Sequence, residues 1–407
     1  MKYNKKECLK DILLLFLLCI VIFNFLSGFY GFLQKENLID DFTLRYRESK
    51  YILNGIDPFN IILEKQKAIP RIGELADVAG YTPWGMVYGI AFNLVILPLR
   101  CARWIFCMLY IGVMILTAYI IYRETIKRNF EKKDSIIVTL GMLSIYGWST
   151  GLNWLNVGAI LGVLIFYSIL IMDKFPILSG IFLGIAAAKP QIALPFFLGY
   201  LVLKKYKIFV TATIIPTFAW IISFVLTKTL PFEMLLEFKE VINVIGNQLG
   251  NWITGFGVLY NANFNDSRIQ FIGMILCILI ALYSWNKMNR EKVNGENDKL
   301  CFFSVAAVLS VMWTYSQEHD KTVLIIVIMA IVGMWKALNS EKEKKFLLLV
   351  MLCCIIDATK VTNMFKCLLA VGTLPELVIE FVRNLVLISF VLFLTNGKNI
   401  QEKKDAV

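Results

Sequence analysis

The sequence predicts an all-α fold, that of a polytopic membrane protein with about twelve transmembrane helices. The chain of 407 residues is 58% hydrophobic and 17% charged, whereas a soluble globular protein carries roughly 25% charged residues. Predominantly apolar runs, such as 11–33, 101–122 and 208–227, are long enough to cross a hydrocarbon core of roughly 30 Å as helices. Basic residues cluster between these runs, as is typical of cytoplasmic loops.

The net charge of +11 and the nine cysteines do not point to nucleic acid or to a metal. The basic residues occur in short clusters beside apolar runs and not on one amphipathic face, so we interpret them as topology signals. The cysteines lie in or next to apolar segments, without the spacing of metal ligands or of an extracellular disulfide framework. We therefore expect contact with membrane lipid, free thiols, no nucleic acid, no metal and no cofactor.

The basic clusters orient the chain in a bacterial cytoplasmic membrane with both termini in the cytoplasm. Lysines within the first ten residues hold the N-terminus inside, and no A-x-A cleavage site follows, so 12–33 is an uncleaved first span. Residues 34–100 form a first external loop in which 84–98 is a juxtamembrane helix. The second span is 101–122.

A proline interrupts the segment that follows the next hairpin, 135–172. About 29 residues separate Lys174 from the basic cluster that begins at Lys204, so this segment must leave and re-enter the cytoplasm as two short helices. Lys189 and Pro190 lie at its external tip. Because irregular backbone within a membrane needs protein or water around it, the tip indicates an internal cavity.

The second half of the chain repeats the alternation of apolar runs and basic loops. Residues 208–228 leave the cytoplasm again, and 229–267 form a second external loop with an amphipathic portion. Further spans are expected near 268–286, 300–316, 322–338, 345–357 and 382–396. The whole chain, 1–407, is thus expected to be a single integral membrane domain.

Four stretches with chemically informative side chains occur in order along the chain. They are Asp41 with Gly55-Ile56-Asp57-Pro58-Phe59 and Tyr81-Thr82-Pro83-Trp84; Gly151-Leu152-Asn153-Trp154-Leu155-Asn156; Gly184-Ile185-Ala186-Ala187-Ala188-Lys189-Pro190; and Tyr315-Ser316-Gln317-Glu318-His319. Each is common alone. Their order and spacing resemble the polyprenyl-phosphate-dependent mannosyltransferases of the GT-C superfamily, which include the phosphatidylinositol mannoside mannosyltransferases, over residues 35–335. The chain departs from that pattern at Asn153, where Gln is usual, and at Gln317-Glu318, where a Trp-containing pattern is usual.

The resemblance implies a GT-C-like fold and an inverting glycosyltransferase that acts on the outer face of the membrane. Such an enzyme moves a sugar, mannose or another hexose or pentose, from a polyprenyl-phosphate donor to a lipid or cell-envelope glycan acceptor. The chain has neither a Gly-rich nucleotide loop nor an Asp-x-Asp motif, which favours a lipid-linked donor over a nucleotide sugar.

The chemistry of this transfer suggests roles for the polar residues at the external ends of spans. A base must take the proton of the acceptor hydroxyl, a contribution of roughly 10²- to 10⁴-fold, and we assign it to Asp41, with Asp40 as its nearest rival. His319, the only histidine, is either a partner of the base or a donor to the phosphate. A lipid phosphate leaves as a stable anion, so no general acid is required.

The departing phosphate needs cations, for which Lys189, Arg45 and Arg268 are the candidates. The candidates for sugar or acceptor contacts are Tyr81, Trp84, Asn153 and Asn156. Simpler interpretations stay open: a solvated helix end for Asp41, a snorkelling lysine, a satisfied membrane histidine, and aromatic residues of the interfacial belt.

Two other functions remain possible on sequence grounds. A transporter or flippase of lipid-linked saccharides would show matching broken helices in both halves, and the chain shows one such break, at Lys189. A polysaccharide polymerase or ligase would be expected to use arginines of a large external loop. The arginine available near the loop 229–267 is Arg268, which lies just beyond it.

Overall fold

The computed structural model describes residues 5–35, 40–66, 81–249, 267–288, 293, 295–313, 316–338, 340–355 and 374–395. Within these ranges every regular element is a helix, as predicted. The helices of the first half are α1 (Lys5–Gln34), α2 (Asp41–Leu53), α3 (Pro58–Gln66), α4 (Pro83–Phe92), α5 (Leu99–Lys127), α6 (Lys132–Leu143), α7 (Tyr146–Trp154), α8 (Gly158–Ile171), α9 (Pro176–Ala186) and α10 (Pro190–Val202). Those of the second half are α11 (Tyr206–Thr227), α12 (Pro231–Leu249), α14 (Ser267–Lys287), α15 (Glu296–Met312), the 3₁₀ helix η3 (Glu318–Leu324), α16 (Ile325–Met334), the 3₁₀ helix η4 (Trp335–Ala337), α17 (Glu341–Ile355) and α19 (Leu374–Thr395).

Four of the described helices are long and apolar enough to cross a membrane: α1, α5, α11 and the 378–395 portion of α19. A fifth span results if α6 and α7, which meet at a bend of 45°, count as one. Helices α8, α9, α10 and the apolar part of α14 are shorter than 18 residues. The all-helical fold is therefore confirmed for the described residues, and the candidate spans are consistent with a polytopic membrane protein, while the number of about twelve spans stays a prediction.

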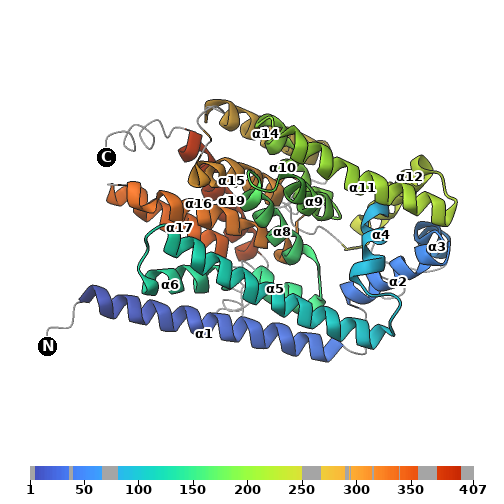
Figure 1. Ribbon diagram of the computed structural model, residues 1–407, viewed down its shortest axis with the longest axis horizontal. Coiled ribbons are helices and arrows are strands. Elements are labelled where there is room, and N and C mark those ends of the chain that lie inside the picture. Colours follow the sequence, from blue (N-terminus) through green and yellow to red (C-terminus); the bar gives the residue numbers. More distant parts are fainter. Residues whose placement is uncertain are drawn as a thin grey trace.

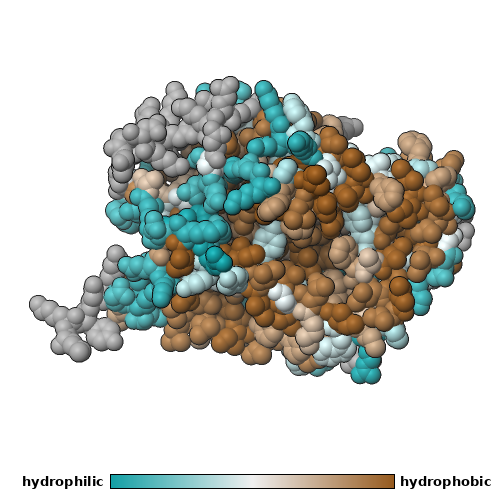
Figure 2. Space-filling view, viewed as in Figure 1, coloured by the Kyte–Doolittle hydropathy of each residue, from teal (hydrophilic) through white to brown (hydrophobic). Residues whose placement is uncertain are grey.

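The long helices present apolar side chains to the outside. Phe16 on α1, Ile115 on α5 and Phe218 on α11 are 60%, 65% and 62% exposed. Figure 2 shows such apolar side chains over much of one face of the molecule. An exposed apolar surface of this extent indicates contact with lipid.

The two ends of α1 differ in character. Where α1 begins, Lys10 pairs with Asp134 at 2.8 Å and Lys133 with Asp11 at 2.7 Å, so α1 is tied to the start of α6. Beyond its other end, helices α2, α3, α4 and α12 gather, at the right in Figure 1. The 30 residues of α1 separate the two ends by roughly 45 Å at 1.5 Å per residue.

Helices α15 and α16 form the centre of the molecule. Residues 299–312 of α15 are buried on every face, as are residues 325–332 of α16. The 3₁₀ helix η3 precedes α16 and packs against α7 and α8. The expected span at 322–338 therefore begins with a tight 3₁₀ segment in the interior, and this segment carries His319.

The proline break predicted at Lys189 separates two short helices. Helix α9 ends at Ala186 and α10 begins at Pro190, whose missing N–H and fixed φ suit the first position of a helix. The expected juxtamembrane helix at 84–98 is α4, which ends earlier, at Phe92. Helix α12 occupies the first part of the expected second external loop, 229–267, and the remainder of that loop lies largely outside the described residues.

Candidate active site

Asp40 and Asp41 open α2 but face different partners. Asp40 is the N-cap of α2, and its Oδ1 accepts a hydrogen bond from the Thr43 backbone N–H at 2.8 Å. Its Oδ2 accepts from Arg103 Nε at 2.7 Å, and Arg103 also donates to the Phe32 carbonyl at 2.8 Å. Asp40 has no exposed surface. One oxygen of Asp40 thus caps α2, and the other connects α2 through Arg103 to the start of α5 and the end of α1.

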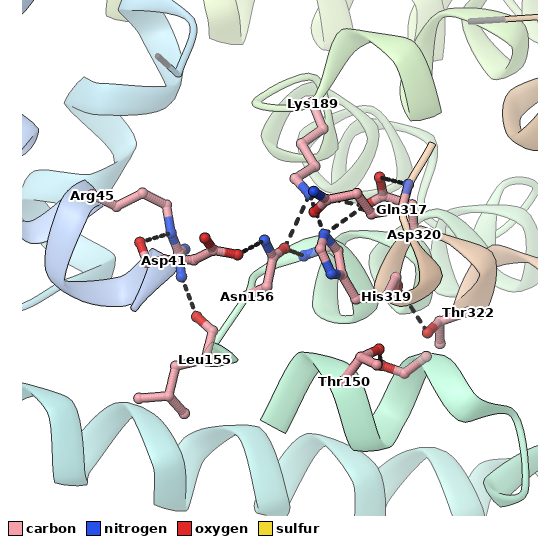
Figure 3. A network of polar contacts seen from close by, with 12 residues as sticks. Asp41, Arg45, Thr150, Leu155, Asn156, Lys189, Gln317, His319, Asp320 and Thr322 are labelled. Atoms are coloured by element: carbon pink, nitrogen blue, oxygen red, sulfur yellow. Dashed lines mark hydrogen bonds and ion pairs between the residues drawn. The ribbon is translucent and has the colours of Figure 1, made fainter. Parts of the chain in front are cut away.

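Asp41 points towards the turn between α7 and α8. Its Oδ2 accepts a hydrogen bond from Asn156 Nδ2 (Figure 3). Burial raises the pKa of Asp41, while the Asn156 hydrogen bond and the charges of Arg45 and Lys189 oppose that rise. A carboxylate with a raised pKa binds a proton more strongly than an ordinary one, which is the property required of a general base.

The turn at Leu155 and Asn156 fixes how the Asn156 amide is oriented. Leu155 adopts a left-handed conformation with φ of 46°, which ends α7 and directs the next side chain inward. Asn156 Oδ1 then accepts from the Gly158 backbone N–H at 2.7 Å and from Lys189 Nζ at 3.0 Å. Because two N–H donors face the oxygen, the amide nitrogen is the atom that faces Asp41.

Lys189 lies at the centre of the polar network in Figure 3. Its ammonium is 2.8 Å from Asp320 Oδ1, 3.0 Å from Asn156 Oδ1 and 3.0 Å from His319 Nε2. Burial alone would lower the pKa of Lys189, but the carboxylate of Asp320 raises it, so the side chain is a cation at neutral pH. The side chain of Asp320 is 1% exposed and also accepts from the Gln317 backbone N–H at 3.1 Å.

His319 is neutral in this network. Burial and the neighbouring Lys189 ammonium lower its pKa to about 3. Since Nε2 accepts from Lys189 Nζ, the ring proton is assigned to Nδ1. A group with so low a pKa is a weak proton acceptor at neutral pH.

Glycines on α7 and α8 allow η3 to approach this closely. A Cβ on Gly158 would lie 2.3 Å from Asp320 Oδ1 and 2.6 Å from His319 Cδ2. A Cβ on Gly147 would lie 2.6 Å from Thr322 Oγ1. Close approach of the backbone is thus what places the charged end of η3 beside Asn156.

Arg45 lies one helical turn after Asp41. Its Nη2 donates to the Leu155 carbonyl, and its Nε donates to the backbone carbonyl of Asp41 at 3.1 Å. The guanidinium carbon is 5.5 Å from the ring centres of Tyr81 and Phe106. Tyr81, whose pKa is raised by burial, is also electrostatically coupled to Lys189 and Asp41. The structure therefore brings Arg45 and Tyr81 to the same site.

Trp84 packs on the turn that carries Lys189. Its Nε1 donates to the Ala187 carbonyl at 2.7 Å, and its ring lies 6.2 Å from that of Trp220. Thr82, the N-cap of α4, donates to the Ala188 carbonyl at 3.2 Å. Thr82 and Trp84 thus fix the backbone of the turn that carries Lys189, without donating a described hydrogen bond to the polar side chains of the network around Lys189.

Two further predicted residues lie elsewhere. The Asn153 amide packs against α1, where a Cβ on Gly31 would lie 2.3 Å from Asn153 Oδ1. Arg268 belongs to the first turn of α14, and its side chain is outside the described residues, as is Tyr315.

Sequence reasoning missed two charged residues of the site. Asp320 follows His319 directly, and its adjacency to the only histidine was the available signal. Lys35 lies just past α1, with its ammonium over the ring of Trp154. Burial lowers the pKa of Lys35 to about 8, against the opposing charges of Asp41 and Asp40. In the described part of the chain, no three His, Cys, Asp or Glu side chains are arranged to hold a metal ion.

Comparison with known proteins gives one family. The model of glycosyltransferase family 87, a GT-C-type family, matches residues 81–359. The matched segment contains Asn156, Lys189, His319 and Asp320, whereas Asp41 precedes it. No curated protein and no solved structure matches the chain.

Proposed function

The chain belongs to glycosyltransferase family 87, and on that premise we propose that it is an inverting enzyme with a polyprenyl-phosphate sugar as donor. The acceptor is a hydroxyl of a lipid or cell-envelope glycan outside the bacterial cytoplasmic membrane. Asp41 is the catalytic base. The observation that carries this assignment is the Asp41 carboxylate, which has a raised pKa and is oriented by Asn156.

The surroundings of the other two candidates favour Asp41 as the base. Both oxygens of Asp40 are engaged, one by the first turn of α2 and one by the Arg103 guanidinium. His319 has a pKa of about 3, and its Nε2 lone pair accepts from Lys189. Asp41 retains Oδ1 and part of Oδ2 for a substrate proton, because a carboxylate has about four acceptor positions.

In the proposed reaction the acceptor oxygen attacks the anomeric carbon from the face opposite the phosphate. The new glycosidic bond forms as the bond between that carbon and the phosphate oxygen breaks, and the hydroxyl proton passes to Asp41. The bonding electrons leave with polyprenyl phosphate, which needs no proton. A cation next to the phosphate stabilises the departing charge, and Arg45 is the guanidinium placed one turn from the base.

The distribution of charge supports an extracytoplasmic site. Lys10 and Lys133 mark the end of the molecule where α1 begins, whereas Asp41 follows the other end of α1. Basic residues are retained on the cytoplasmic side. The site is thus expected on the opposite face, where lipid-linked sugar donors meet envelope acceptors.

The reaction is tested with purified protein in detergent, radiolabelled polyprenyl-phosphate sugars and bacterial membrane lipids. Labelled product formed by the wild type and not by Asp41→Asn would support the proposal and begin to identify the acceptor. Full transfer by a folded Asp41→Asn variant would refute the assignment of the base. No turnover with any carrier, together with movement of a lipid-linked saccharide in proteoliposomes, would favour a flippase instead.

A further inference from the structure

The hydrogen-bonding capacity of Lys189 is fully used within the protein. An ammonium group has three N–H donors. The three acceptors within 3.0 Å of Lys189 Nζ are Asn156 Oδ1, His319 Nε2 and Asp320 Oδ1. A phosphate oxygen could bind this ammonium only by displacing one of them.

The charge of Lys189 is also compensated. Asp320 Oδ1 lies 2.8 Å from the ammonium, and the lysine side chain is only 8% exposed. A buried ion pair is costly to break by removal of one partner, because the other charge is then left without compensation. Arg45 differs: the described contacts employ Nε and one N–H of Nη2, out of five donors.

We infer that Lys189 and Asp320 form a positioning pair that acts on the catalytic base through Asn156 and does not bind the donor phosphate. The inference rests on the proposed function and specifies it. Arg45 is then the cation that binds the phosphate. Lys189 donates to Asn156, and Asn156 in turn donates to the base, Asp41.

The coupling passes through the amide of Asn156. Lys189 and the Gly158 N–H both donate to Asn156 Oδ1, and this arrangement directs Nδ2 to Asp41. Without Lys189 the amide loses one of the two donors that define its orientation. A flipped amide would present its oxygen to the Asp41 carboxylate, which repels it. The base would then be less well oriented, and its ionised form would lose a stabilising donor.

Several charged or titratable groups face Asp41 from the elements around it. They are Arg45 and Asp40 from α2 and its N-cap, Lys189 from the α9–α10 turn, Lys35 from the end of α1, and Tyr81 from the start of α4. Loss of Lys189 removes both a cation and the ordered amide. Both changes move the ionisation of Asp41 to higher pH.

The test compares steady-state kinetics of Lys189→Met and Arg45→Gln across donor concentration and pH. For Lys189→Met we expect kcat to fall about tenfold or more, since a positioned base contributes roughly 10²- to 10⁴-fold. The KM for the donor should stay within about twofold, and the acidic limb of the kcat profile should move to higher pH. Arg45→Gln should instead raise the donor KM and weaken inhibition by free polyprenyl phosphate.

A double-mutant cycle with Asn156→Ala distinguishes a Lys189 that acts through Asn156 from a Lys189 that binds the donor phosphate. If Lys189 acts through Asn156, the loss of kcat in Lys189→Met/Asn156→Ala should be no larger than in Asn156→Ala alone. Independent effects that multiply, or a tenfold rise in donor KM for Lys189→Met without movement of the acidic limb, would overturn the inference.

Lys321→Met provides a matched control. Lys321 is a buried lysine on η3, the 3₁₀ helix that carries Asp320. Its ammonium lies 3.2 Å from Glu380 and also contacts Glu318, so it pairs with carboxylates other than Asp320. Its substitution should lower stability without moving the acidic limb. Movement equal to that of Lys189→Met would show a general effect of losing a buried ion pair and would contradict the inference.

Lys189→Arg covers the case in which Lys189→Met does not fold. It retains the charge and the ion pair with Asp320, but a planar guanidinium cannot place its donors on all three acceptors. We expect a low kcat at unchanged donor KM, whereas a phosphate ligand replaced by arginine would retain activity. A wild type inactive with every donor would refute the proposed function itself, and an active wild type with active Lys189→Arg would refute this inference alone.

Discussion

The substitution Gly158→Ala tests whether the close approach of η3 to α8 sets the geometry of the site. The added Cβ would lie 2.3 Å from Asp320 Oδ1, and ordinary contact begins at 3.4 Å. The carboxylate would therefore move by about 1 Å in a closely packed interior. The same Cβ would lie 2.6 Å from His319 Cδ2, so the ring must also give way.

A movement of this size weakens the 2.8 Å ion pair between Asp320 and Lys189. Overpacking of a core costs about 1–3 kcal/mol, which exceeds the gain of up to about 1 kcal/mol from replacing a helical glycine by alanine. A displacement of about 1 Å at a supporting residue can lower a rate about 10²-fold. We thus expect both a lower Tm and a transfer rate reduced by one to two orders of magnitude.

The assay pairs thermal unfolding in detergent, followed by tryptophan fluorescence, with the rate of labelled sugar transfer. Gly112→Ala on α5 is the control, because a Cβ there would meet no atom within 4 Å. We expect Gly112→Ala to retain the wild-type rate and a Tm equal to or above that of the wild type. Wild-type Tm and rate in Gly158→Ala would refute the described packing of η3.

Three further predictions concern stability. His319 has a folded pKa of about 3 against an ordinary 6.5, so the unfolded chain binds a proton at higher pH than the folded protein does, and stability should fall as the pH drops below 6.5. At pH 5 this loss amounts to about 2 kcal/mol, and His319→Gln should remove it. The measurement is the decrease in Tm between pH 7 and pH 5, which should be smaller in His319→Gln than in the wild type. Burial and Asp57 raise the pKa of Glu237 to about 7, so the folded state keeps this proton to higher pH and stability should decline from pH 4.5 to pH 7. Glu237→Gln should therefore increase the free energy of unfolding at pH 8 by about 1 kcal/mol or less after solvent screening, which raises Tm, and should leave Tm unchanged at pH 4. An equal rise in Tm at both pH values would contradict this. Asp40→Asn leaves the Arg103 guanidinium buried without its counter-charge and should cost about 3–5 kcal/mol; an unchanged Tm would show that the pair does not hold α2.

The sequence was sufficient for the helical membrane architecture and for the break at Lys189. Hydropathy reports the apolar composition of each segment. Pro190 has no backbone N–H to donate, so a proline at this position interrupts a continuous helix. The same signals overestimated one segment: the expected span 153–172 contains α8, which covers only Gly158–Ile171, because the left-handed residue Leu155 ends α7 and a turn precedes α8. Helices α9 and α10 are the two short helices that the sequence indicated.

Asp41, Lys189 and His319 were each expected at the external end of a span, and the network in Figure 3 places the three within one chain of contacts. The division of labour between Asp40 and Asp41 was not predictable. It depends on Arg103, which is distant in sequence and reaches Asp40 only after folding.

The orientation of Asn156 was equally hidden. It requires the left-handed turn at Leu155 and the ammonium of Lys189, and sequence spacing specifies neither. Asn153, three residues earlier, shares the same motif but faces α1. Residue type alone therefore could not separate the amide that orients the base from the amide that packs between helices.

The most direct test of the proposed base is the single-turnover rate of sugar transfer from pre-bound polyprenyl-phosphate donor, measured for the wild type and for Asp41→Asn. Donor binding is measured in parallel, so that a loss of rate is not confused with a loss of affinity. We predict unchanged donor binding and a rate lower by roughly 10²- to 10⁴-fold in Asp41→Asn. A folded Asp41→Asn variant whose rate stays within about tenfold of the wild type would contradict Asp41 as the base.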